Sequence, residues 1–262
     1  MQQQIVRFLA ACAVSVPAIE VDAEPISLSG LDESQWRYDL TVYAFLPART
    51  KGTSTIAGGS VDLDLDFRDA VDLLDYAMAG RFEAWREDWG LIFDANYVRL
   101  EAGGQISLPP GGAVNVNADI RQKWLGVLAA YRVANSTYGS QNLRYAIDLQ
   151  AGVRWNALEQ AVTAATPGPT VNLGGDESWA EPVIGARGVW EIADNWAAAV
   201  QVDAGGFGAG GNDLQVGLTA GIDWKPWENT SLKFGWRYYS IDYKTTRSDG
   251  PFEYDVYQHG PY

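Results

Sequence analysis

The chain has 262 residues and a formal net charge of −14, from 19 Lys and Arg against 33 Asp and Glu. This acidic balance argues against a nucleic-acid partner, because the phosphate backbone requires a basic face. Charged residues make up 20% of the chain, too few for a disordered polyanion, and no run of about 18 apolar residues after the N-terminus predicts a membrane-spanning helix.

The N-terminus is typical of an export signal. A short segment with one positive charge, Arg7, precedes the apolar sequence FLAACAVSVPAI. Residues 21–23 (VDA) give the small-x-small pattern of a cleavage site, so we expect residues 1–23 to be a signal peptide and residues 24–35 a polar periplasmic lead-in. A lipoprotein box ending at Cys12 is disfavoured, because too few apolar residues precede it. Removal of the signal peptide leaves no cysteine, which excludes thiol chemistry.

From residue 36 onward, apolar and polar residues alternate in segments that turn signals separate. The first segment, 36–47, has Trp, Tyr, Leu and Val on one side and Arg, Asp and Thr on the other, which predicts a β-strand. The stretch SVDLDLDF at 60–67 alternates in the same way. A calcium loop is the alternative interpretation, but Phe67 and Leu73 stand where an EF-hand needs Gly and Glu. A strand with one solvated carboxylate face is therefore favoured.

The same alternation predicts the later strands, most clearly over residues 143–156. Leu149 and Trp155 share an apolar face there, and Asp148 and Arg154 share a polar face, so the period is that of a strand and not of a helix. We expect strands at 36–47, 76–87, 89–101, 114–133, 143–157, 177–191, 194–206, 213–225, 230–244 and 252–262. Short turns alternate with longer Gly- and Pro-rich loops between them, which is typical of outer-membrane barrels.

These strands predict an all-β fold, a transmembrane antiparallel up-and-down β-barrel over residues 36–262. The preferred count is about ten strands, since bacterial barrels have an even number. Twelve strands are the alternative, because residues 48–75 have room for a further short pair. Residues 69–75 also have room for a helical turn.

The polar faces of the predicted strands carry charges of both signs. One interpretation is a polar pore lining, and the other is a lumen filled by ion pairs. The second is favoured, because a barrel of about ten strands has little free space. The residues expected to face the lumen are Arg37, Asp39, Arg81, Glu83, Asp94, Arg144, Asp148, Arg154, Glu181, Arg187, Asp203, Asp223, Lys233 and Arg237.

Tryptophans flank the predicted short turns. Such a cluster is expected for an aromatic girdle at one membrane–water interface, where an indole keeps its ring in lipid and its N–H near water. Core tryptophans of a soluble sandwich would more often lie in mid-strand. The residues of the predicted girdle are Trp85, Trp89, Trp190, Trp196, Trp224 and Trp227.

Four segments together resemble a known family. EPVIGAR at 181–187, DAGGFG at 203–208, GWRYYSIDY at 235–243 and GPY at 260–262 resemble, in order and spacing, the motifs of uncharacterised proteobacterial outer-membrane β-barrel proteins. The resemblance covers residues 36–262. It implies a bacterial outer-membrane location, a monomer, and membrane lipid and the barrel-assembly machinery as partners, but no reaction or ligand. Members continue past the GPY position to a terminal aromatic residue, so we expect this chain to be truncated within its final strand.

The sequence thus predicts a porin-like protein of a Gram-negative outer membrane, with a structural, surface or narrow-channel role and no catalysis. Membrane-embedded enzymes of this architecture usually pair a histidine with Ser or Asp. His259 is the one histidine, and nothing in the sequence brings Ser240 or Asp255 to it. No catalytic residue, metal ligand or cofactor is expected. Two alternatives stay open: a membrane-embedded lipid-modifying enzyme, and a soluble periplasmic β-barrel whose apolar faces line a cavity for an apolar ligand.

Overall fold

The computed structural model describes residues 35–56, 58–108, 112–165, 170–227, 229–247 and 250–262. The predicted signal peptide, residues 1–23, lies outside the described residues, and so does the predicted lead-in apart from Gln35. Within the described part of the chain, no helix is long and apolar enough to cross a membrane.

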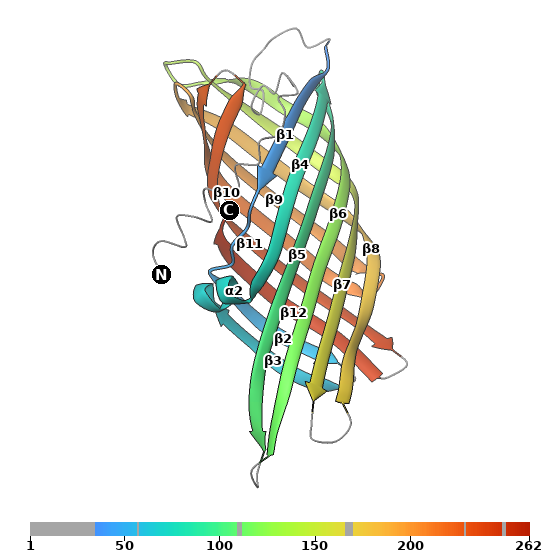
Figure 1. The fold of residues 1–262 in the computed structure, drawn as a ribbon. Coiled ribbons are helices and arrows are strands. Elements are labelled where there is room, and N and C mark those ends of the chain that lie inside the picture. Colours follow the sequence, from blue (N-terminus) through green and yellow to red (C-terminus); the bar gives the residue numbers. More distant parts are fainter. Residues whose placement is uncertain (1–34, 57, 109–111, 166–169, 228, 248–249) are drawn as a thin grey trace.

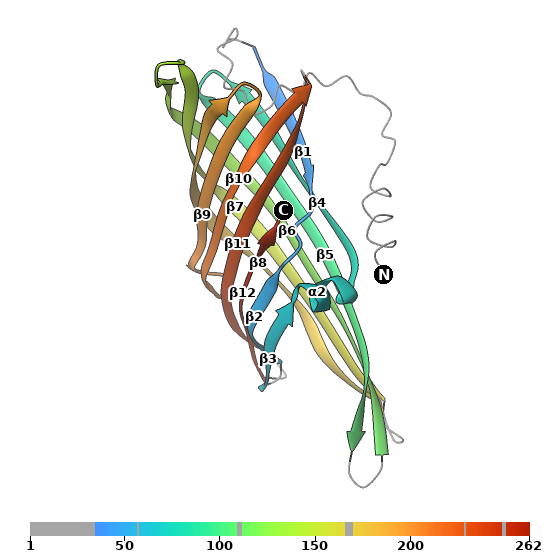
Figure 2. The same cartoon turned by 90° about the vertical axis from the view of Figure 1, so that its left-hand side faces the viewer.

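The described residues form one curled antiparallel sheet of twelve strands, with one short helix at its side (Figure 1, Figure 2). The elements are β1 (Arg37–Tyr43), β2 (Arg49–Ile56), β3 (Gly59–Asp66), α2 (Phe67–Leu73), β4 (Leu74–Arg86), β5 (Trp89–Leu108), β6 (Gly112–Tyr138), β7 (Leu143–Ala165), β8 (Thr170–Ala193), β9 (Trp196–Ala209), β10 (Asn212–Trp227), β11 (Thr230–Arg247) and β12 (Gly250–Pro261). The sheet order is β1-β4-β5-β6-β7-β8-β9-β10-β11-β12-β2-β3. The prediction of an all-β, antiparallel, barrel-like fold is confirmed.

The sheet has twelve strands and not the preferred ten, because residues 48–75 contain the short pair that the alternative count required. β2 and β3 form a hairpin in which Lys51 pairs with Asp64 and Thr53 with Asp62. The alternation in SVDLDLDF is therefore that of β3, the strand at one end of the sheet order.

The predicted helical turn is α2, which begins directly after β3. The Asp66 side chain caps it by accepting hydrogen bonds from the backbone N–H groups of Asp69 at 3.1 Å and Arg68 at 2.7 Å. The Asp69 carboxylate in turn accepts from the Asp66 N–H at 3.0 Å, which completes a capping box. The bonds from Asp69 and Arg68 favour the charged carboxylate and lower the pKa of Asp66.

Several predicted loops are strand extensions. The β5–β6 ladder continues to the pair Leu108 and Gly112, and the β7–β8 ladder continues to the pair Ala165 and Thr170. The predicted loops 102–113 and 158–176 are thus mostly strand. Their Gly- and Thr-rich composition has no clear apolar alternation and therefore gives no strand signal in the sequence. The ladder still forms, because backbone N–H and C=O groups pair whatever the side chains are.

The first and last strands meet through the segment between β1 and β2. The Leu46 N–H donates to the Pro261 carbonyl at 3.1 Å, and the Ala48 N–H donates to the His259 carbonyl at 2.8 Å. β2 then pairs with β12 from Arg49, opposite His259, to Thr55, opposite Glu253. Among the described residues, β1 itself pairs only with β4 and β3 only with β2, so the sheet curls into a barrel-like wall in which residues 46–56 link β1 to β12.

Gly52 makes this junction possible, and its replacement by alanine should weaken it. Its φ is +151°, and an added Cβ would lie 2.0 Å from the Asp255 carbonyl oxygen of β12. We expect Gly52→Ala to destabilise the fold by more than about 1 kcal/mol in urea titration of the refolded protein. Gly80→Ala is the control, because its added Cβ would come no closer than 3.6 Å to a neighbouring atom, the Thr41 carbonyl oxygen. Equal midpoints for the two variants would contradict this account.

The outer face is apolar on the half of the sheet that carries the short turns after β4, β6, β8 and β10. In β7, Leu149 and Val153 are 51% and 52% exposed, whereas Asp148 and Arg154 beside them are 0% and 5% exposed. We call this outer surface the apolar band; its most exposed members include Leu40, Val42, Met78, Leu149, Val153, Ile184, Val202, Leu218 and Phe234. In this half the side chains are apolar outside and polar inside.

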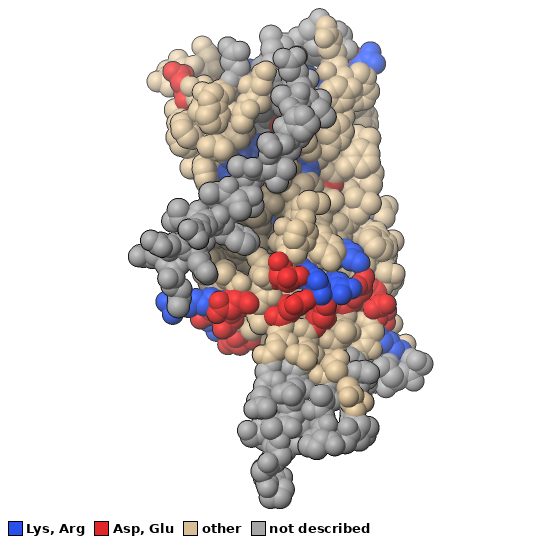
Figure 3. Space-filling model, viewed as in Figure 1, with Lys and Arg blue, Asp and Glu red and all other residues tan. Residues whose placement is uncertain are grey.

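On the other half this polarity is reversed. Acidic and basic side chains gather there on the outer face, and Figure 3 shows part of them as a belt beneath a wide uncharged surface. This charged belt includes Arg49, Lys51, Asp62, Asp64, Arg99, Glu101, Asp119, Arg121, Glu159, Asp242 and Lys244.

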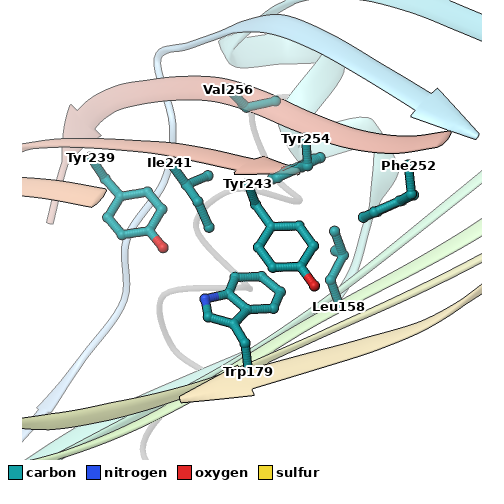
Figure 4. Packing of buried hydrophobic residues seen from close by; sticks show 8 residues of the cluster. All are labelled: Leu158, Trp179, Tyr239, Ile241, Tyr243, Phe252, Tyr254 and Val256. Atoms are coloured by element: carbon teal, nitrogen blue, oxygen red, sulfur yellow. The ribbon is translucent and has the colours of Figure 1, made fainter. Parts of the chain in front are cut away.

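The inner face behind the charged belt is a hydrophobic core. Ile241 and Tyr243 are each 2% exposed, and they flank Asp242 of the belt on the same strand. Side chains from the facing walls meet there, with the rings of Trp179 and Tyr243 stacked at 3.9 Å (Figure 4). Leu158 and Phe252 pack into the same cluster. The wall thus resembles a soluble protein in this half, with charge outside and an apolar interior.

Candidate functional site

The interior of the apolar-band half is a network of buried ion pairs. Arg187 of β8 donates to Glu83 of β4 at 2.7 Å and to Asp148 of β7 at 2.8 Å, and all three side chains are at most 6% exposed. Arg132 of β6 donates to the other oxygen of Asp148 at 2.9 Å. Because β4 and β8 are not neighbours in the sheet, the pair of Glu83 and Arg187 ties facing parts of the wall together.

Further pairs extend this interior network toward β9, β10 and β11. They are Arg81 with Glu83 and Asp94, Arg154 with Asp203 and Glu181, and Lys233 with Asp223. Asn212 also donates a hydrogen bond to the Glu181 carboxylate. Each buried charge in these pairs has an opposite charge beside it, as a stable interior of this kind requires.

The structure places the residues of the predicted polar lining as follows. Arg81, Glu83, Asp94, Asp148, Arg154, Glu181, Arg187, Asp203, Asp223 and Lys233 form the interior pairs, and Asp39 and Arg237 line the same interior cavity. Arg37 is half-buried. Arg144 is at the rim, where its side chain is 38% exposed and pairs with Glu191 at 2.5 Å.

Arg132 belongs to the network but was not among the predicted residues. It is 6% exposed, and its ring neighbour is Trp85 at 4.8 Å from the guanidinium carbon. The signal in the sequence is its place two residues after Ala130, which is 1% exposed, on the face opposite Tyr131. A charge next to the inward-facing apolar residues Leu128 and Ala130 indicates an interior ion pair.

Trp85 is not part of an outer girdle, and this prediction is wrong. Its side chain is 6% exposed, and its indole N–H donates to Glu83 at 2.8 Å inside the sheet. The guanidinium groups of Arg132 and Arg187 lie over its ring. Trp85 follows Glu83 by two residues and therefore shares its inward face, a parity that proximity to a turn does not reveal.

The other predicted girdle residues differ from Trp85 in exposure. Trp89 and Trp227 are 62% and 58% exposed beside the short turns, and Trp196 and Trp224 stack on each other at 5.6 Å with exposures of 37% and 36%. Trp190 is half-buried. These side chains lie on the outer face near one end of the apolar band.

The interior of the described structure includes three neighbouring cavities. A polar cavity of about 120 Å³ lies among the ion pairs, between Asp39, Arg81 and Lys233. A second cavity of about 280 Å³, which we call the apolar chamber, lies behind the charged belt and α2. A small cavity of about 40 Å³ contains Arg237 and shares lining residues with both. These three cavities thus adjoin one another through shared lining residues.

The arrangement brings no catalytic set together at the one histidine. His259 pairs with Tyr238 across the β11–β12 ladder, and its ring lies 5.8 Å from that of Trp236. No hydrogen bond joins His259 to Ser240 or Asp255, all three of which are described. Within the described residues, no group of three or more His, Cys, Asp or Glu side chains is arranged to hold a metal ion.

Comparison with models of known protein families found no match, and comparison with curated proteins found none either.

Proposed function

We propose that this protein is a monomeric β-barrel of a bacterial outer membrane, with a structural, surface or narrow-channel role and no catalysis. The observation that carries the proposal is the alternation of exposure in the apolar band. Leu149 and Val153 are half exposed to the outside, while Asp148 and Arg154, the residues next to them on the strand, are buried in ion pairs. Exposed apolar surface on this scale is costly in water and favourable against lipid.

In this proposal the apolar band meets membrane lipid, and the exposed tryptophans at its edge form the girdle. Trp89 and Trp227 have the exposure that an interfacial indole needs. The charged belt then lies outside the hydrocarbon layer. The resemblance to proteobacterial outer-membrane barrels favours the same location, with the barrel-assembly machinery as the folding partner.

The interior favours a narrow lumen over an open pore. The ion pairs around Arg187 cross between facing strands, and the polar cavity beside them holds about 120 Å³. Passage of a sugar-sized solute would require several buried pairs to separate together. Small ions are the largest solutes that we expect the lumen to conduct.

The two alternatives have less support. A soluble barrel with an apolar ligand requires the Leu- and Trp-rich faces to line the cavity, whereas Leu149, Val153 and Trp155 are exposed outside. A lipid-modifying enzyme requires an activated nucleophile, and His259 has no hydrogen bond to Ser240 or Asp255. These observations favour a barrel without catalysis.

Three measurements on the refolded chain test the proposal. We expect the protein to partition into the detergent phase, to give small-ion conductance at most in planar bilayers, and to leave liposomes impermeable to sugars in a swelling assay. Folded protein that stays in water without detergent would contradict the membrane assignment. Sugar-permeable liposomes would contradict the narrow lumen.

A further inference from the structure

The apolar chamber is an interior space with the size and lining of a ligand pocket. Its volume of about 280 Å³ is close to the lower end of small-molecule sites, at about 300 Å³, and exceeds an apolar cavity of about 150 Å³ that takes up benzene. Apolar side chains from β3, α2, β5, β6 and β7 line it, including Leu63, Leu65, Val71, Leu100, Ile120 and Val162.

The stretch SVDLDLDF builds one wall of this chamber. Leu63 and Leu65 line the chamber, while Asp62 and Asp64 alternate with them and bond outward to Thr53, Arg49 and Lys51 of β2. The aspartates thus belong to the charged belt, and the leucines form an apolar surface behind it. Hydrocarbon is the chemistry that this inner surface fits.

The chamber is polar at one end, where it leads to Arg237. Gln122 and Gln258 line both the chamber and the small cavity that contains the Arg237 side chain. Gln160, 5% exposed in the chamber wall, donates to Ser54 at 3.4 Å and has a side-chain oxygen without a hydrogen-bond partner. A ligand with an apolar tail and a polar head would match the apolar lining and the polar end of the chamber.

Arg237 differs from the other interior arginines. Arg81, Arg154 and Arg187 each pair with a carboxylate, whereas no described Asp or Glu forms an ion pair with Arg237. Its guanidinium carbon lies 4.7 Å from the Trp124 ring, 5.7 Å from Phe45 and 5.9 Å from Tyr239. Arg237 also forms a hydrogen bond with the hydroxyl of Tyr43, which donates to Asp94 at 2.8 Å. These contacts hold the guanidinium in place without a direct carboxylate partner, and a planar guanidinium is suited to bind a carboxylate.

α2 covers the part of the wall nearest the chamber. Beyond β3 the sheet has no further strand, and α2 packs there against β2, β3 and β5 (Figure 2). Ala70 and Val71 of α2 line the chamber. Exposed apolar side chains lead from the apolar band toward α2: Met78 is 60% exposed, Tyr76 49% and Phe67 44%. Apolar surface thus continues from the apolar band to the helix that covers the chamber.

We propose that the apolar chamber and Arg237 form one binding site for a single-chain carboxylate amphiphile. The hydrocarbon tail lies among Leu63, Leu65 and Ile120, and the carboxylate binds the Arg237 guanidinium. The volume of the chamber suits one alkyl chain, and a carboxylate supplies the negative charge that no described Asp or Glu provides to Arg237 in an ion pair. This site goes beyond the proposed structural or narrow-channel role and does not depend on conductance.

The test uses the full chain in lipid nanodiscs with a stearate that carries a nitroxide on its tail, at alkaline pH where its carboxylate is ionised. Bound probe gives an immobilised component in the electron paramagnetic resonance spectrum, distinct from probe in the bilayer. We expect such a component with the wild type. Laurate should displace the probe at a concentration about tenfold lower than dodecanol does, because a hydrogen bond to a charged group is worth about that factor in affinity.

Three variants locate the site. Arg237→Gln should weaken probe binding about ten- to a hundredfold. Ala118→Phe places a ring in the chamber from β6 and should abolish the immobilised component. Ala129→Phe is the matched control on the exposed outer face of the same strand and should leave binding unchanged. Heat-modifiable mobility in SDS gels checks that each variant is folded.

Absence of an immobilised component with the wild type would overturn the proposal, and so would a component that persists in folded Ala118→Phe. Dodecanol that competes as well as laurate would overturn the role of Arg237. That comparison uses the wild type alone, so it holds even if Arg237→Gln does not fold. If the protein proves soluble, which would contradict the proposed membrane location, the same titration can be done without nanodiscs.

Discussion

Replacing Arg187 by leucine is expected to destabilise the folded protein by about 3–5 kcal/mol, because two buried carboxylates each lose one of their two arginine partners. Glu83 and Asp148 are 5% and 0% exposed, and each accepts hydrogen bonds from the Arg187 guanidinium. The loss exceeds that of an ordinary hydrogen bond, because two buried carboxylates each lose a charged partner, which leaves only Arg81 beside Glu83 and only Arg132 beside Asp148. The free energy of unfolding in urea, measured on protein refolded into lipid, gives the value.

Arg144→Leu is the matched control for this variant. Its side chain is 38% exposed at the rim, where it pairs with Glu191, so its loss should cost about 0–1 kcal/mol. Equal losses for Arg187→Leu and Arg144→Leu would contradict the interior placement of the network.

The alternation of residues sufficed to predict the sheet and the facing of most of its charges. In β7, the sequence alone assigns Asp148 and Arg154 to one face and Leu149 to the other, and the burial of these side chains agrees. This works because successive side chains of a strand point to opposite faces, whatever the rest of the fold does.

The contacts between facing walls could not be predicted in the same way. Glu83 and Arg187 are 104 residues apart, and their pairing depends on how strongly the sheet curls and on how its strands are staggered. Trp85 shows the related failure: its closeness to a turn suggested an outer girdle, while its parity with Glu83 places it inside. Register and curvature are properties of the whole sheet and leave no local signal.

The apolar chamber was hidden by the reversal of polarity along the sheet. A barrel in lipid predicts apolar side chains outside, so the leucines of SVDLDLDF would be assigned to the outer face. The ladder with β2 instead pairs Asp64 with Lys51 and Asp62 with Thr53, and the opposite face, with Leu63 and Leu65, lines the chamber. A strand outside the hydrocarbon layer follows the rule for soluble proteins, and its sequence alone does not state on which side of that boundary it lies.

That boundary yields the most direct test of the membrane assignment, using two positions on the outer face of β7. Leu149 is 51% exposed in the apolar band, and Ala161 is exposed beyond it, opposite Asp119 of the charged belt. Leu149→Arg should cost about 2–4 kcal/mol if lipid covers this position, because a charge on the lipid face loses its hydration near the midplane of the bilayer.

Ala161→Arg should cost about 0–1 kcal/mol, since arginine there remains in water and faces a carboxylate. Both variants add the same side chain to the same face of one strand, so strand propensity and size cancel in the comparison. Urea titration of protein refolded into lipid vesicles measures the difference, and repetition at high salt separates it from screening of the belt charges. Equal losses at the two positions would mean that no hydrocarbon boundary lies between them, and the apolar band would then need a protein partner in place of lipid.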